Sequence, residues 1–69
     1  MDDQYFEFLS AVLDAYKQDD QRVNDWERGF LKDMVTRFDK YGKNTYVSEK
    51  QWNAIKRVAQ VYDLELEQF

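Results

Sequence analysis

Two tetrapeptides, Asn24-Asp25-Trp26-Glu27 and Ser48-Glu49-Lys50-Gln51, decide how this chain of 69 residues folds. Each begins with a side chain that can accept a hydrogen bond at a helix N-cap. Each also carries Glu or Gln three residues later, which can accept from the backbone N–H of the cap residue. The second stretch has Val47 before the cap and Trp52 after it, which is the pattern of a hydrophobic staple. The two stretches therefore predict two helix starts and divide the chain into three segments.

Apolar residues recur at spacings of three and four in all three segments, which places them on one face of a helix. We expect helices at about residues 2–18, 25–41 and 49–66. Gly42 follows the second helix, where helices commonly end. Three amphipathic helices with short links bury their apolar faces only against one another, so the sequence predicts an all-α fold, a compact three-helix bundle, as a single domain over residues 1–69. We expect its core to contain Leu9, Phe30, Phe38, Ile55 and Tyr62.

The residue types that are missing argue against several classes of function. The chain has no cysteine and no histidine, so it has no disulfide framework, no Cys-based zinc site, and no Ser–His or Cys–His pair for nucleophilic catalysis. The carboxylates of the first segment do not form a pair, because Glu7 and Asp14 are two turns apart on the polar side. We therefore expect no enzymatic activity, no bound metal and no cofactor.

The start of the chain, Met1-Asp2-Asp3-Gln4, is acidic and is not followed by a long apolar run, so we expect no signal peptide. No stretch approaches 18 consecutive apolar residues, so we expect no membrane span. These features predict a protein of the cytoplasm, and of the host cytoplasm if the protein belongs to a phage.

Charge is unevenly distributed along the chain, although the net charge is only −4. Residues 1–20 carry one lysine against six acids and residues 61–69 carry three acids and no base, whereas residues 21–60 carry nine bases against five acids. A positive surplus beside Asn and Gln side chains can contact phosphates, since electrostatics supplies most of non-specific affinity for nucleic acids. The alternative is an ordinary soluble surface of mixed charge. The candidate nucleic-acid contacts are Arg28, Lys32, Lys50, Lys56 and Arg57.

Trp26 and Trp52 allow two interpretations. Both lie on the predicted apolar faces, so they can be core anchors with one edge at the surface. The alternative is that one of them is partly exposed and binds a protein partner, because Trp and Tyr are enriched at such sites. The chain has twelve aromatic residues, more than a core of this size readily accommodates, which favours an exposed aromatic patch.

A motif pair covering residues 24–62 resembles one found in small phage-encoded helical proteins. Its first part is Trp26-Glu27-x-x-Phe30-Leu31-x-x-Met34-x-x-Arg37, and its second is Val47-Ser48-Glu49-Lys50-Gln51-Trp52-x-x-Ile55. The pair resembles that of the short accessory protein associated with the T4-type UvsW recombination and repair helicase. The resemblance implies a phage accessory module that works with DNA-processing machinery. It implies no ATPase, because the chain has no Gly-x-x-x-x-Gly-Lys-Ser/Thr run to hold phosphates.

Two functional hypotheses follow from different features. The first is a non-enzymatic accessory module of phage DNA replication, recombination or repair, with a phage or host DNA-processing protein as partner and weak nucleic-acid contact through the second and third helices. The second is a protein-interaction module, or an inhibitor of a host factor, that docks through Trp26 or Trp52.

Overall fold

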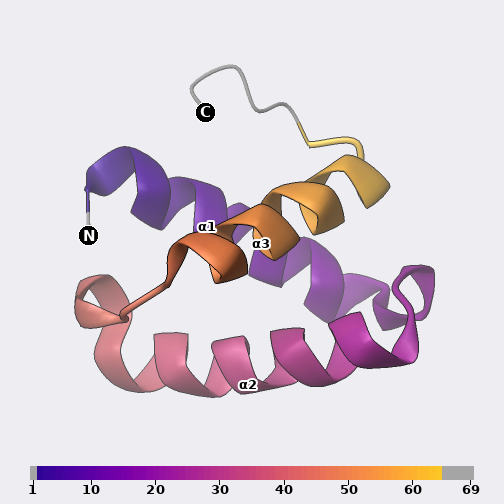
Figure 1. Cartoon of the computed structure of the whole chain (residues 1–69), viewed down its shortest axis with the longest axis horizontal. Coiled ribbons are helices and arrows are strands. Elements are labelled where there is room, and N and C mark those ends of the chain that lie inside the picture. Colours follow the sequence, from indigo (N-terminus) through magenta and orange to yellow (C-terminus); the bar gives the residue numbers. More distant parts are fainter. Residues whose placement is uncertain (1, 65–69) are drawn as a thin grey trace.

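The computed structural model describes residues 2–64 of the protein and, over this range, contains three α-helices and two short 3-10 helices (Figure 1). The elements in chain order are α1 (Asp3–Gln18), η1 (Asp20–Arg22), α2 (Asp25–Tyr41), η2 (Gly42–Asn44) and α3 (Glu49–Val61). Helix α2 runs opposite to α1 and α3, and the start of α1 lies near the start of α3 (Figure 1). The predicted all-α three-helix bundle is confirmed, and residues 2–64 contain no strand.

Short-range hydrogen bonds define the helix starts. Asn24 Oδ1 accepts from the N–H of Glu27 at 2.7 Å, and Glu27 Oε1 accepts from the N–H of Asn24 at 3.1 Å. Ser48 Oγ and Gln51 Oε1 make the equivalent pair, at 3.2 and 2.9 Å. Both predicted capping boxes are therefore present, and α2 has its predicted bounds. The first helix begins at Asp3 because Asp2 is its N-cap.

The predicted end of the third helix is wrong, because α3 stops at Val61 and not near residue 66. The N–H of Leu64 donates to the carbonyl of Ala59 at 2.9 Å, and the N–H of Asp63 donates to that of Gln60 at 3.1 Å. This bond pair is the Schellman motif, and Asp63 takes its left-handed position with φ 59°. Leu64 then leaves the helix and packs against the core. Leu66, expected on the same apolar face, lies outside the described residues.

The core lies where the three helices meet, and side chains from all three are fully buried there. Its largest members are Leu9, Val12, Leu31, Met34, Ile55 and Val58. The prediction for Leu9 and Ile55 is confirmed, whereas the three predicted aromatic members Phe30, Phe38 and Tyr62 are only partly buried and pack against the edge of the core. The fully buried positions are held mainly by aliphatic side chains, and several large rings pack against them from outside.

Candidate docking surface around Trp26

Trp26 is the most exposed tryptophan of the described residues, with 67% of its surface accessible. Its indole stacks on the ring of Phe30, with the centroids 5.6 Å apart and the planes 9° from parallel. Of the two interpretations of Trp26, the core anchor is therefore wrong, and the exposed side chain is the one observed. Trp26 is the second residue of α2, five residues before the buried Leu31, which is a rotation of about 140° around the axis. Its spacing therefore fits the apolar stripe, but its side chain does not face the core.

The surroundings of Trp26 leave the indole uncovered. Gly29 is one turn further along the same side of α2 and is exposed. Apart from its chain neighbours and the nearby helix backbone, a Cβ at this position would have no atom within 4 Å. The neighbouring acids are already paired with arginines, Asp25 with Arg28 at 3.0 Å and Asp33 with Arg37 at 3.2 Å. An apolar ring held in place by Phe30, with a gap beside it, is the kind of anchor that protein interfaces use.

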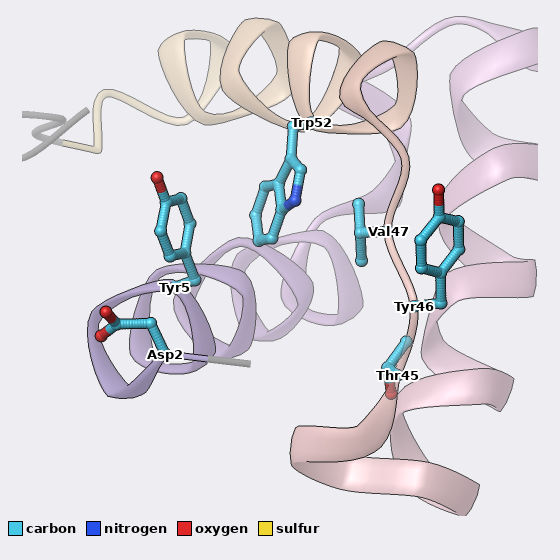
Figure 2. A pocket seen from close by; sticks show the side chains of 6 residues that line it. All are labelled: Asp2, Tyr5, Thr45, Tyr46, Val47 and Trp52. Atoms are coloured by element: carbon cyan, nitrogen blue, oxygen red, sulfur yellow. The ribbon is translucent and has the colours of Figure 1, made fainter.

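Trp52 occupies a different environment at the opposite end of the bundle. Its ring lies between α3 and α1, 5.0 Å from the ring of Tyr5 and 6.3 Å from that of Phe8, measured between centroids. The core-anchor interpretation therefore applies to most of this side chain. The remaining edge lines a pocket of about 260 Å³ (Figure 2), whose other lining residues are Asp2, Tyr5, Thr45, Tyr46 and Val47.

The two tryptophans lie at opposite ends of the bundle. Each lies near the start of its helix, and α2 and α3 run in opposite directions (Figure 1), so the two cannot belong to one docking surface.

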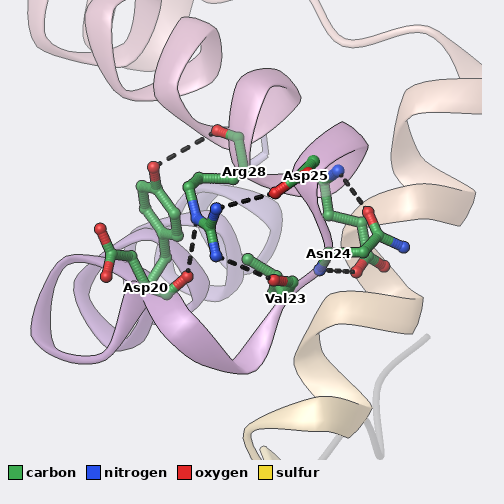
Figure 3. Close-up of polar contacts among 7 residues, drawn as sticks. Asp20, Val23, Asn24, Asp25 and Arg28 are labelled. Atoms are coloured by element: carbon green, nitrogen blue, oxygen red, sulfur yellow. Dashed lines mark hydrogen bonds and ion pairs between the residues drawn. The ribbon is translucent and has the colours of Figure 1, made fainter.

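Arg28, a predicted nucleic-acid contact, is used by the fold (Figure 3). Its guanidinium donates to the carbonyl of Asp20 at 3.1 Å, to that of Val23 at 3.4 Å and to the carboxylate of Asp25 at 3.0 Å. These contacts tie the link between α1 and α2 to the first turn of α2. The structure thus gives Arg28 an intramolecular role that the sequence interpretation missed.

The other four predicted contacts are distributed over α2 and α3, and those of α3 lie on more than one side of the helix. Lys50 and Arg57 are exposed and seven residues apart, so they share one side of α3. Lys56 is rotated by about 100° from Arg57, toward the flank where Trp52 meets α1, and is partly buried. Lys32 is exposed on α2. None of the four takes part in an ion pair within residues 2–64.

Tyr46 is the most exposed large apolar side chain of the described residues, at 76%, and the sequence interpretation did not select it. It lies in the link before α3, beside Val47, which faces Trp52 (Figure 2). The available signal was an aromatic residue in a short extended link, where no helical face exists to bury it.

Two ionisable contacts support the fold and suggest no chemistry. The hydrogen bond from the Lys43 ammonium lowers the pKa of the Asp3 carboxyl below its ordinary value and raises that of Lys43. Burial is the main reason why the pKa of Tyr62 is raised, and the nearby carboxylates of Asp19 and Asp20 add to the effect. The Tyr62 hydroxyl donates to the carbonyl of Asp19 at 2.5 Å, which joins the ends of α1 and α3.

Within residues 2–64, no three acidic side chains lie close enough together to hold a metal ion. Among the same residues, no helix has the length and apolar character needed to cross a membrane. Comparison of the chain with protein-family models, curated proteins and solved structures gives no match.

Proposed function

We propose that this protein is a non-enzymatic interaction module that docks on a partner protein through Trp26. The observation that carries the proposal is the exposure of Trp26 on the face of a regular helix, with its ring stacked on Phe30. An indole at this position contributes little to the core, and anchoring aromatic residues dominate the energetics of many interfaces. For the class of partner we retain the resemblance of residues 24–62, and propose a DNA-processing protein of a phage or its host, with a helicase of the T4-type UvsW kind as the first candidate.

The test is titration calorimetry of the purified protein against that helicase. Trp26→Ala is expected to weaken binding by about 30-fold or more, the effect of losing an anchor worth at least about 2 kcal/mol. Tyr41→Ala is the matched control, since Tyr41 is also an exposed aromatic side chain, at 50%, and lies at the other end of α2 from Trp26. Equal affinity of wild type and Trp26→Ala would refute docking through Trp26, whereas no binding by the wild type would refute the partner class.

A direct nucleic-acid contact is the second candidate, supported by the absence of ion pairs at Lys50 and Arg57 within residues 2–64 and by their common side of α3. The test is fluorescence anisotropy with labelled single-stranded and forked DNA at several salt concentrations. Real phosphate contacts give a negative slope of log K against log salt, reduced by about 0.7–0.9 for each contact removed. Lys50→Glu with Arg57→Glu is expected to reduce the slope, and Lys56→Glu, on the other flank, serves as control. Absence of binding at low salt would eliminate this candidate.

A further inference from the structure

The pocket beside Trp52 has features that the docking of Trp26 does not use. It is formed where the start of α1, the link 45–47 and the first turn of α3 meet, at the end of the bundle opposite Trp26 (Figure 2). Its volume of about 260 Å³ is below the usual range for small-molecule sites, which begins at about 300 Å³. A space of this size suits one side chain of a partner or a small organic group.

The walls of the pocket are aromatic and aliphatic. Tyr5 and Trp52 stand side by side with their ring planes at 53°, and Val47 lies on the other side of the indole (Figure 2). An aliphatic chain can lie against such surfaces. The faces of both rings also attract a cation.

Among the described residues that line the pocket, one carries a charge, and it is a carboxylate. That residue is Asp2, and the Asp2 carboxylate uses one oxygen, Oδ1, to accept from the N–H of Gln4 at 3.0 Å as the N-cap of α1. Its second oxygen takes part in no hydrogen bond or ion pair within residues 2–64. Three of the six acids among the first twenty residues, Asp2, Asp3 and Glu7, lie at this end of α1, whereas Lys17 lies at its other end. Lys43, the nearby base, pairs with Asp3.

We propose that this pocket binds an alkylammonium group, such as the side chain of a lysine on a partner protein. The methylene chain of the ligand lies along Trp52, and its ammonium group meets the Tyr5 ring and the Asp2 carboxylate, because Tyr5 stands between Asp2 and the indole (Figure 2). This division of one side chain into an apolar stem and a charged head matches the arrangement of the pocket. The inference does not depend on the docking of Trp26, because the two sites are at opposite ends of the bundle.

The test uses three probes with the same four-carbon skeleton and different charge, namely n-butylammonium, 1-butanol and butyrate, at neutral pH. Binding is followed by the indole N–H resonances in nitrogen-15 correlation spectra, assigned with Trp26→Phe. We expect the Trp52 signal to shift and saturate most readily with n-butylammonium and least readily with butyrate. The Trp26 signal is an internal control that is expected not to move.

Asp2→Asn isolates the contribution of the carboxylate, because Asn is an equally good N-cap and α1 should keep its start. This variant is expected to bind n-butylammonium about two- to fivefold more weakly, the usual effect of losing one exposed charge pair. Asp14→Asn is the matched control, since it makes the same change in net charge on an exposed residue further along α1. Raised salt is expected to lower the affinity of the wild type for n-butylammonium toward that of Asp2→Asn.

Three results would overturn the proposal. Equal binding of 1-butanol and n-butylammonium would identify a merely apolar hollow. Tighter binding of butyrate would mean that the positive ends of the helices control the pocket. No saturable shift of Trp52 with any of the probes would mean that the pocket does not bind groups of this size.

Discussion

The replacement of Gly29 by alanine should stabilise this protein, although it adds a side chain to a helix that is already well formed. Gly29 is in the interior of α2 and is exposed, and a Cβ at this position would have no atom within 4 Å outside its chain neighbours and the nearby helix backbone. A glycine in a helix interior costs about 0.5–1 kcal/mol relative to alanine, because the unfolded chain loses more freedom when it folds. With no packing cost to subtract, the whole of this difference should appear as stability.

The assay is reversible unfolding followed by circular dichroism, with heat and with urea. A gain of about 0.5–1 kcal/mol corresponds to a rise of about 2–8 °C in the Tm of a domain of this size. Gly42→Ala is the matched control, because Gly42 ends α2 with φ 54° and ψ −126°, a conformation that side chains rarely adopt, and alanine there should cost about 1–3 kcal/mol. A loss of stability in Gly29→Ala, or a gain in Gly42→Ala, would refute the backbone argument.

Four further predictions concern the core, the caps and one titrating group. Ile55→Ala should reduce the free energy of unfolding by about 2–5 kcal/mol in urea titrations, because Ile55 is fully buried, whereas Val61→Ala at the surface should change it by less than about 0.5 kcal/mol. Ser48→Ala should lower the same free energy by about 0.5–2 kcal/mol and Ser48→Gly by only a few tenths, and equal losses would mean that the hydroxyl does not act as a cap. Asp63→Gly should raise the Tm, because glycine adopts the left-handed conformation without strain and a carboxylate at a helix C-terminus is unfavourable; an unchanged or lower Tm would contradict this account of the helix end. The raised pKa of Tyr62 means that the fold favours the protonated hydroxyl. The resulting contribution to the free energy of unfolding should be complete below the ordinary tyrosine pKa of about 10 and be lost as the pH rises above that value. The unfolding midpoint of Tyr62→Phe, measured against pH, should lack this part of the pH dependence.

The sequence determines the helix starts but not every helix end. Both capping boxes join residues three apart, so the sequence alone was enough to place the beginnings of α2 and α3. The end of α3 depends on Asp63, a residue type that adopts the left-handed conformation much less often than glycine, while the apolar spacing continues to Leu66. The spacing of apolar residues therefore predicts a third helix that is longer than the one observed.

The candidate site was only partly predictable, because the width of a buried face depends on how the helices pack. Trp26 fits the spacing of the α2 stripe, yet a small bundle buries only the centre of that stripe. The sequence does not reveal the intramolecular role of Arg28, because its contacts with the carbonyls of Asp20 and Val23 exist only after the link has folded back on α2. An unpaired arginine in a sequence looks like a candidate for nucleic-acid contact. The pocket combines Tyr5 with Trp52, residues far apart in sequence that α1 and α3 bring together.

The pairing of α1 with α3 also sets an order for folding. The bond from Tyr16 to the carbonyl of Arg28 joins α1 to α2 across 12 residues, whereas the bond from Tyr62 to Asp19 spans 43. The entropy of closing the longer loop costs about 1 kcal/mol more, so we expect the α1–α2 hairpin to form first and α3 to dock after the main barrier. Destabilising substitutions between α1 and α2 should then mainly slow folding, and those at the α3 interface should mainly speed unfolding.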